Sequence, residues 1–312
     1  MNKNIKISIV ILTFNRKTLL RVLLSSLAEM TCPGLEMIVV NNHPEESPAE
    51  MIEAEFPRVL LLEMGRNVGI EGRNKGIANA SGDIIVTLDD DILGLDDKAL
   101  EILPSLFDNP QTGAVCFKVL DPVTEQVMNW CHHYPLEKFA DKIFVTNEIT
   151  EGAVAFRRSA LEKSGLYPET FFISHEGPDL AIRLMNNGYN VIYNPVIAVK
   201  HHHSNLGRTN WRRYYYDTRN LFWLAARNFP FFYAVKYLFI GLSAMLVYSV
   251  RDGYAKYWAK GIQDGILGFG KALSERTPMS QRTSEIIRHI EKHKPNFISM
   301  LRMRLFQKEV RI

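Results

Sequence analysis

Apolar residues in the first third of the chain come in short runs, separated by a segment of helical spacing. The runs, rich in Ile, Val and Leu, are residues 5–13, 35–40, 58–62 and 83–88. Between the first two runs, leucines recur every three or four residues, at Leu19, Leu20, Leu23, Leu24 and Leu27. We expect strands that alternate with helices, hence a mainly parallel sheet with its ligand site beyond the carboxyl ends of the strands.

The second half of the chain continues this alternation and then changes character. Short strands are predicted at residues 116–120, 153–156 and 190–193. A helix with Pro178 in its first turn and Gly188 beyond its last is predicted between the last two strands. Residues 229–250 form the most apolar stretch. We therefore divide the chain into a domain of residues 1–228 and a helical, basic region of residues 229–312.

Charge is distributed unevenly between these two parts. Residues 230–312 carry 14 Lys/Arg and 6 Asp/Glu, a net charge of +8, whereas the residues before them carry −5. A basic and partly apolar region of this kind favours contact with a membrane surface, through a helix that lies in the membrane plane. Ordinary burial in a helical subdomain is the alternative.

The composition of the chain indicates where in the cell the protein is located and which classes of partner it binds. The cysteines, Cys32, Cys116 and Cys131, form no CxxC pair, which argues against a disulfide framework and favours the cytoplasm or the cytoplasmic face of a membrane. A basic and aromatic stretch at residues 207–229 could suggest nucleic acid. Because the whole chain carries a net charge of only +3, we predict no nucleic-acid partner.

The acidic run VTLDDDIL, residues 86–93, comes at the end of a predicted strand. In its D-x-D spacing, Asp89 and Asp91 can face one ligand. Mg²⁺ and Mn²⁺ are commonly held by one or two carboxylates plus substrate phosphates, and a cation relieves the repulsion between neighbouring carboxylates. The run therefore indicates a divalent-cation site, with a solvated acidic loop as the alternative.

Several motifs together resemble one enzyme family. In chain order they are ILTFNR, VVNN, GRNVGIEGRNKGIANASGDIIVTLDDD, EGAVAFRRSALEKSGLYPETFF, HEGPDLAIRL and VKHHHS. Over roughly residues 5–204 the chain resembles the family 2 glycosyltransferases of the GT-A fold, most of all the non-processive, rhamnosyltransferase-like bacterial enzymes. The Q-x-x-R-W signature of the processive synthases is not present. The resemblance implies a Rossmann-like α/β fold with flanking helices and a C-terminal helical segment.

The resemblance also implies the residues of a nucleotide-sugar site. Thr13 and Asn15, with Arg16 beside them, match the loop after the first strand, and Asn15 is also placed to cap the helix that follows. Asn41 stands where the family usually has an aspartate that touches the pyrimidine ring, a role open to an amide. The other matching positions are Asn67, Gly69, Arg73, Asn74, Asp89, Asp90 and Arg208.

The catalytic acid departs from the family pattern. The family usually shows E-D-x-D-L with the second letter as the base, whereas residues 176–180 read EGPDL. Glu176 and Asp179 remain as candidates. Glu176 is preferred, because Asp179 lies near the helix N-terminus and can contact Arg183 four residues on. The implied metal ligands are Asp89, Asp91 and His201, with His203 as a neighbour that a shift in register would bring in.

The activity implied is the transfer, with inversion, of a sugar from a nucleoside-diphosphate sugar to a hydroxyl of a glycan or lipid-linked glycan. UDP or dTDP is the favoured nucleotide, Mg²⁺ or Mn²⁺ the cofactor, and cell-surface polysaccharide biosynthesis the setting. One alternative is a degenerate, non-catalytic glycan- or nucleotide-sugar-binding scaffold, suggested by Asn41 and Gly177. Another is a sugar-phosphate nucleotidyltransferase, but residues 11–20 lack the glycine-rich phosphate loop expected of one.

Overall fold

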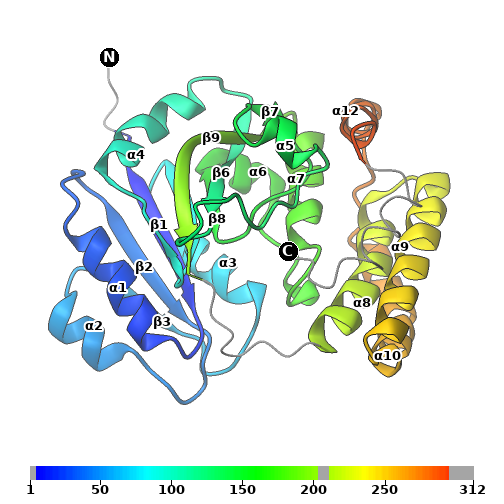
Figure 1. Ribbon diagram of the computed structural model, residues 1–312, viewed down its shortest axis with the longest axis horizontal. Helices are drawn as coiled ribbons and strands as arrows, with labels where there is room; N and C mark the ends of the chain where they lie inside the picture. Colours follow the sequence, from blue (N-terminus) through cyan, green and yellow to red (C-terminus); the bar gives the residue numbers. More distant parts are fainter. Residues whose placement is uncertain (1–4, 203–210, 295–312) are drawn as a thin grey trace.

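A computed structural model describes residues 5–202 and 211–294 of the chain. Within these residues the strands form one nine-stranded sheet in the order β3-β2-β1-β4-β8-β6-β9-β5, with β7 paired to β9 beside this path (Figure 1). The strands are β1 (Ile7–Thr13), β2 (Glu36–Asn41), β3 (Leu60–Glu63), β4 (Ile84–Asp89), β5 (Ile92–Leu93), β6 (Thr112–Leu120), β7 (Phe144–Val145), β8 (Ala153–Arg157) and β9 (Asn190–His201).

Strand direction is uniform in the first half of the sheet and varies beyond β4. β3, β2, β1 and β4 are parallel to one another, β8 runs antiparallel between β4 and β6, and β6 is parallel to β9. The short strands β5 and β7 are antiparallel to β9. The predicted α/β fold with flanking helices and a C-terminal helical segment is confirmed, with a sheet that is parallel in its first half and mixed beyond it.

Helices cover both faces of the sheet and continue as a helical region. Those of the first half are α1 (Lys17–Ala28), α2 (Ala49–Glu55), α3 (Ile70–Asn79), α4 (Asp97–Ile102), the 3₁₀ helix η1 (Leu103–Phe107) and α5 (Leu136–Phe139). Those that follow are α6 (Arg158–Ser164), the 3₁₀ helix η2 (Glu169–Phe171), α7 (Glu176–Asn186), α8 (Trp211–Asn228), α9 (Phe231–Arg251), α10 (Ala255–Leu267), α11 (Phe269–Ser274) and α12 (Gln281–Glu291).

The alternation of side chains along β1 divides the core into two layers. Ile7, Ile9 and Ile11 pack against α1, α2 and α4, whereas Val10 packs on the opposite face with α3, α6 and α7. Successive residues of a strand point to opposite faces, so an uninterrupted apolar run is what a strand covered on both sides requires. The leucines predicted to form one helical face are the buried side of α1, with Leu19 at its margin.

The first helix begins differently from the prediction. Its N-cap residue is Arg16, whose side chain makes no capping hydrogen bond, so the expected cap by Asn15 is wrong. Asn15 instead has a φ of 54°, a left-handed conformation that asparagine tolerates better than most residues and that turns the chain out of β1.

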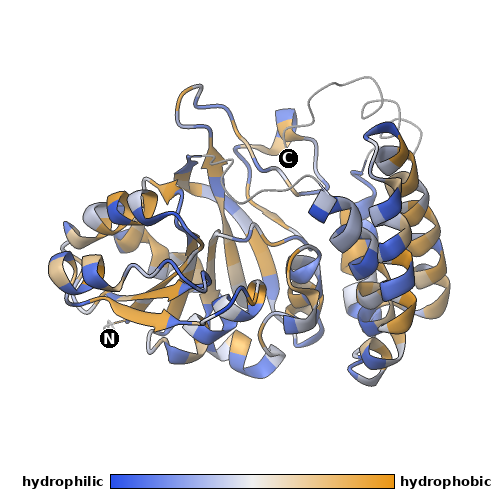
Figure 2. Ribbon diagram, turned by 90° about the horizontal axis from the view of Figure 1, so that it is seen from below, coloured by the Kyte–Doolittle hydropathy of each residue, from blue (hydrophilic) through white to orange (hydrophobic). Residues whose placement is uncertain are grey.

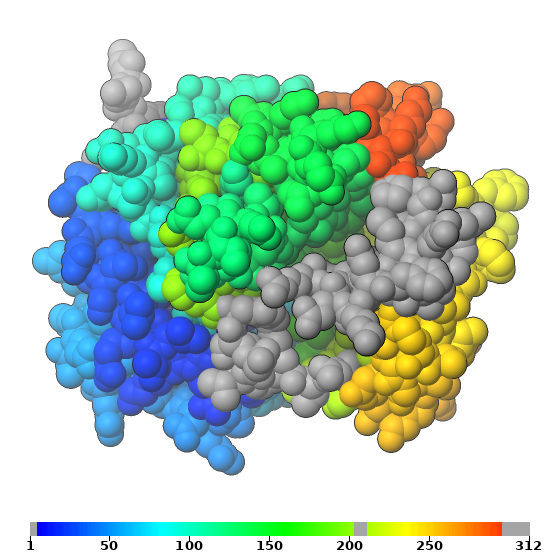
Figure 3. Space-filling view, in the orientation of Figure 1, coloured from blue at the N-terminus to red at the C-terminus, as the bar shows by residue number. Residues whose placement is uncertain are grey.

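Helix α8 connects the sheet to the helices that follow it. It packs against α7 on one side and against α9, α10 and α11 on the other, and Figure 3 shows α9 and α10 (yellow to orange) along one side of the molecule. The predicted boundary at residues 228 and 229 falls between α8 and α9. Thus α8 lies within the predicted domain of residues 1–228 by sequence position, but it packs against both that domain and the helices that follow.

Helix α9 has one covered face and one open face. Its Met245 and Tyr248 are buried in a small cluster with Tyr214 and Leu221 of α8. The opposite face is apolar and exposed, and Figure 2 shows it in orange at the outer edge of the molecule. Among the described residues α9 is the one helix long and apolar enough to cross a membrane, with 11% of its most apolar window buried.

Candidate active site

Polar side chains gather at the carboxyl ends of three neighbouring parallel strands. Thr13 at the end of β1 is in register with Asn41 at the end of β2. The preceding residue of β1, Leu12, is in register with Asp89 at the end of β4. Because parallel strands end at the same edge of a sheet, three of the sequence motifs meet at this edge, where ligands bind in open α/β sheets.

The middle aspartate of the acidic run is bound by the protein itself. Thr13 Oγ1 donates a hydrogen bond to Asp90 Oδ2 over 2.6 Å, and Arg16 Nη1 lies 3.0 Å from Asp90 Oδ1. Burial raises the pKa of the Asp90 carboxyl to about 6. These contacts fasten the loop after β1 to the turn after β4, which gives Thr13, Arg16 and Asp90 a structural role whatever they do to a ligand.

The two outer aspartates are each paired with an arginine. Arg73 Nη2 donates to Asp89 Oδ1 over 2.5 Å, and Arg16 Nη1 donates to Asp91 Oδ2 over 2.7 Å. Asp89 also lies against Gly152, where a Cβ atom would fall 2.4 Å from the Asp89 carboxyl carbon. With a φ of 80° as well, position 152 accepts glycine alone without displacing Asp89.

The end of β9 brings His201 to the acidic turn. His201 is in register with Ile92 of β5, and its Nε2 lies 3.2 Å from Asp91 Oδ1. Both side chains are buried, with Asp91 1% and His201 4% exposed. The Asn129 amide contacts the other ring nitrogen, His201 Nδ1, over 2.6 Å and so fixes the plane of the ring.

The spacing of Asp91 and His201 fits a shared divalent cation. Two adjacent ligands of an octahedral ion at about 2.1 Å are about 3 Å apart, close to the separation of these two atoms. Among the described residues there is no group of three or more His, Cys, Asp or Glu side chains that could hold a metal. Asp91 and His201 would supply two ligands of a cation here, together with phosphate oxygens or water. His203 and Arg208 lie outside the described residues.

Glu176 begins α7 and faces the site from a strained segment. It is 6% exposed, and its Oε2 has no hydrogen-bond partner among the residues that the structure describes. Burial is the largest cause that raises the pKa of Glu176 to about 7. The residues before it, Ser174 and His175, both have positive φ, and Asn220 Nδ2 donates to the Ser174 carbonyl over 2.7 Å. Such strain persists where the surroundings fix it, commonly at functional sites.

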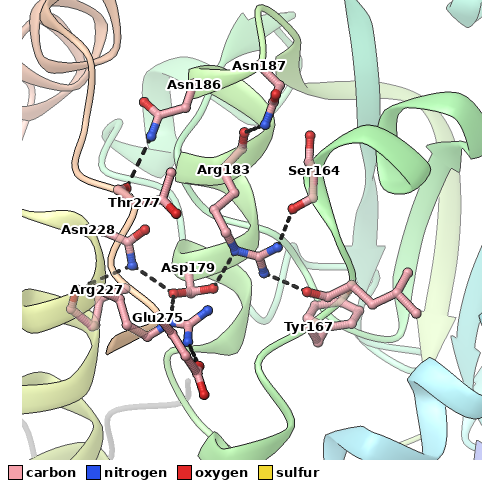
Figure 4. A network of polar contacts seen from close by, with 12 residues as sticks. Ser164, Tyr167, Asp179, Arg183, Asn186, Asn187, Arg227, Asn228, Glu275 and Thr277 are labelled. Atoms are coloured by element: carbon pink, nitrogen blue, oxygen red, sulfur yellow. Dashed lines mark hydrogen bonds and ion pairs between the residues drawn. The ribbon is translucent and has the colours of Figure 1, made fainter. Parts of the chain in front are cut away.

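Asp179 is committed to holding α7 against α8. The predicted contact with Arg183 is present, at 2.8 Å from Arg183 Nε to Asp179 Oδ2. Arg227 Nε and Asn228 Nδ2 of α8 donate to Asp179 Oδ1 over 2.8 and 2.7 Å (Figure 4). Asp179 is fully buried, and these partners keep its pKa below the ordinary value although burial alone would raise it. A carboxylate held in this way is poorly suited to take a proton.

The remaining predicted donor-binding residues make contacts within the chain. Asn41 Nδ2 donates to Glu63 Oε2 over 2.8 Å, and Asn67 Oδ1 accepts from the Gly69 amide over 3.1 Å. Asn74 binds both backbone groups of Tyr167, with its Nδ2 2.8 Å from the carbonyl oxygen and its Oδ1 3.0 Å from the amide nitrogen. These side chains organise the loops of the sheet edge, and their contacts to a nucleotide stay a prediction.

Gly69 brings the segment before α7 to the sheet edge. It has a φ of 61°, and a Cβ atom there would lie 2.2 Å from the carbonyl oxygen of Phe172. The next amide, that of Ile70, donates to the same oxygen over 2.8 Å. The glycine of the predicted nucleotide-wrapping segment thus positions the chain that leads to Glu176.

Glu151 also lies at this site and is not among the residues predicted from the sequence. Its carboxylate reaches the N-terminus of α7 from the turn before β8, and it stands directly before Gly152. The signal in the sequence was Gly177, a glycine where the resembling family has an acid. A missing acid prompts a search for another one, but only the folded chain shows where that acid is.

Three solved structures share the fold of this chain. PcManGT, a mannosyltransferase from Pyrobaculum calidifontis solved with GDP-Man and Mn²⁺, is 18% identical with a TM-score of 0.57, over 99% of this chain and 89% of that chain. S. aureus TarS 1-349 in complex with UDP-GlcNAc is 14% identical with a TM-score of 0.60, over 92% and 90%. GalNAc-T7 with UDP, GalNAc and Mn²⁺ is 16% identical with a TM-score of 0.55, over 71% and 51%.

These identities are low, so the three likenesses establish the fold alone, and they confirm the expected GT-A architecture. A search of curated protein sequences finds no significant match. Residues 8–165 match the family described as Glycosyl transferase family 2. Since that match spans half of the 312 residues and includes the acidic run at the sheet edge, the chain belongs to glycosyl transferase family 2 and is a glycosyltransferase.

Proposed function

We propose that this glycosyltransferase moves a sugar, with inversion at the anomeric carbon, from a nucleoside-diphosphate sugar to a hydroxyl of a glycan or lipid-linked glycan. PcManGT and TarS, which share the fold, were solved with GDP-Man and UDP-GlcNAc, and this supports a nucleotide-sugar donor. UDP or dTDP is the nucleotide we favour, because Asn41 stands at the position that touches a pyrimidine ring in the family.

The observation that carries the proposal is the convergence of Asp89, Asp91 and His201 at the carboxyl edge of the sheet. Asp91 and His201 have the 3.2 Å spacing of two ligands of one ion. A bound Mg²⁺ or Mn²⁺ would supply positive charge to the leaving diphosphate. Asp89 forms an ion pair with Arg73 and lies at the same sheet edge, where the diphosphate would bind.

The same geometry supports Glu176 as the base. An inverting transfer needs a carboxylate that accepts the acceptor's hydroxyl proton while the oxygen attacks the anomeric carbon from the face opposite the leaving group. Glu176 is buried with a pKa near 7, close to the pH at which it must work. Asp179 is held by two arginines and an asparagine, which supports Glu176 over Asp179.

The exposed apolar face of α9 supports contact with a membrane, where a lipid-linked acceptor would be located. The open face of α9, formed by Phe231, Phe232, Val235, Phe239, Leu246 and Val250, is exposed, with Phe232 85% accessible. Because the other face of α9 packs against α8, the helix suits insertion along a membrane surface better than a span. We place the enzyme on the cytoplasmic face of a membrane, where a lipid-linked acceptor would be within reach.

The donor and the metal are tested by one screen. Purified enzyme is incubated with UDP-, dTDP- and GDP-sugars, with Mn²⁺, Mg²⁺ or EDTA, and release of the nucleoside diphosphate is measured. We expect release from one nucleotide class, its loss in EDTA, and at least a 100-fold decrease in Asp91→Asn. Activity that is unchanged in EDTA would contradict the metal, and the absence of donor binding with either metal would contradict the function.

Membrane contact is tested by vesicle flotation. The full chain should float with vesicles that contain anionic lipid, and a variant with Phe231, Phe232 and Phe239 all changed to serine should stay in the soluble fraction. A matched variant with serine at the exposed Val123 and Ile143, far from α9 in the sequence, controls for loss of surface apolar area. Equal flotation of all three proteins would contradict the proposal.

A further inference from the structure

Position 177 in the first turn of α7 has no acidic side chain, but the Glu151 carboxylate from another part of the chain lies beside it. Position 177 is glycine, and a Cβ atom built on it would lie 2.0 Å from Oε1 and 3.0 Å from the carboxyl carbon of Glu151. Any side chain at position 177 would therefore occupy the volume that the Glu151 carboxylate now fills. A side chain at position 177 would therefore require the Glu151 carboxylate to move from its present place.

The backbone of Glu151 is fixed beside the acidic turn. The amide of Asp89 donates to the carbonyl of Gly152 over 3.3 Å, and Gly152 lies against the Asp89 carboxylate. Glu151 thus extends from the edge where the diphosphate would bind to the first turn of α7.

Glu176 makes the site a pair of carboxyl groups. It is the residue before Gly177, and its buried Oε2 has no hydrogen-bond partner among the described residues. After burial, the charge of Glu176 is the largest cause that raises the pKa of Glu151, while Arg73 opposes the rise. A neighbouring negative charge disfavours ionisation of a carboxyl group, so the charge of Glu176 makes Glu151 a stronger proton acceptor.

We propose that Glu151 supplies the carboxylate that position 177 lacks, and that Glu151 and Glu176 act together as the general base. This inference rests on the proposed transfer reaction and names a second catalytic residue for it. The acceptor's hydroxyl proton passes to the ionised carboxylate of the pair, and the acceptor oxygen bonds to the anomeric carbon. The bond from that carbon to the phosphate oxygen breaks, and its electron pair leaves with the nucleoside diphosphate.

The first test compares matched glutamine variants in turnover with the donor that the screen identifies. Glu151→Gln should lower kcat at least 100-fold, with the Kd for the donor changed less than threefold. Glu148→Gln is the control, because Glu148 belongs to the same loop but lies 3.3 Å from His133 Nε2, and it should keep wild-type turnover. Turnover of Glu151→Gln within threefold of wild type would overturn the inference.

The second test moves the carboxylate between the two positions. Glu151→Ala should be inactive, and Gly177→Asp alone should lose activity or stability through its clash with Glu151. The double variant Glu151→Ala/Gly177→Asp should recover at least tenfold in kcat over Glu151→Ala. A double variant that folds, binds donor and gains nothing would overturn the inference.

Failure of this inference is distinguishable from failure of the proposed function. If the wild-type enzyme neither binds nor cleaves any nucleotide sugar, the transfer reaction itself is wrong. If wild type is active and Glu151→Gln is equally active, only the role of Glu151 is wrong. The pH dependence adds a readout that a structural role would not move, since Glu176→Gln should shift the acidic limb of any remaining activity to lower pH.

Discussion

Replacing Glu176 by glutamine should stabilise the fold above neutral pH while it removes activity. Glu176 is 6% exposed, and one of its oxygens has no hydrogen-bond partner among the described residues. Asp217 and Asp89 add to the effect of burial, and Arg73 opposes it, so that the pKa rises from 4.5 to about 7. Glutamine has almost the same shape and cannot ionise, so the variant isolates the cost of burying the charge.

The size of the effect follows from the pKa. A tenfold change in acidity corresponds to about 1.4 kcal/mol, so a rise from 4.5 to about 7 corresponds to about 3 kcal/mol. The folded state binds this proton more tightly than the unfolded state, so the free energy of unfolding of the wild type falls as pH rises from 4.5 to 7. Glutamine avoids this loss but leaves an amide to be satisfied, so we expect a gain of about 1–3 kcal/mol at pH 8.

Urea unfolding followed by tryptophan fluorescence across pH 4.5 to 8 measures this gain. It should be smallest at pH 4.5, where Glu176 is protonated in the folded state and half protonated in the unfolded state, and should reach its full value above pH 7. Glu53→Gln, on the exposed side of α2, is the matched control and should leave the unfolding midpoint unchanged. Equal or lower stability of Glu176→Gln at pH 8, or a gain that does not vary with pH, would refute the reasoning.

Three further predictions concern neighbouring residues. Asp179→Ala leaves two arginines without their buried partner and should lower the free energy of unfolding by about 3–5 kcal/mol, measured by urea unfolding; a loss below about 1 kcal/mol would contradict the network. Gly152→Ala should weaken donor binding at least tenfold in calorimetry, because its Cβ would displace the Asp89 carboxylate, and unchanged affinity would show that Asp89 does not bind the donor. His201→Ala should raise the Mn²⁺ concentration for half-maximal activity at least tenfold, whereas an unchanged value would remove it from the metal site.

Much of the fold could be predicted because it depends on local pattern. Apolar runs such as residues 5–13 are strands since each is covered on both faces, and the leucines of α1 recur at helical spacing because one face is buried. Parallel strands then bring the residues that follow them to a common edge. The placement of Asn41 and the acidic run at one edge followed from this rule and is confirmed by the register of β1 with β2 and β4.

The roles of single polar residues were harder to predict from the sequence. Asn15 has the chemistry of a helix cap, yet it occupies a left-handed turn and α1 begins two residues later. Asn74, a predicted ligand residue, binds the backbone of Tyr167 with both of its amide atoms, a contact that the sequence did not indicate. An amide side chain can hydrogen-bond to protein or to ligand groups equally well. Its actual partner therefore depends on which backbone groups the fold brings within hydrogen-bonding distance.

The sequence by itself determined the alternation of strands and helices, the acidic run at a strand end, and the family. These are properties of neighbouring residues, in which side-chain type and spacing are sufficient information. The tertiary structure decided that His201 meets Asp91, that α8 holds Asp179, and that Glu151 fills the space beside Gly177. Those pairs are far apart in the chain, and they meet only because burial of the two core layers fixes the sheet order and the position of α8 on α7.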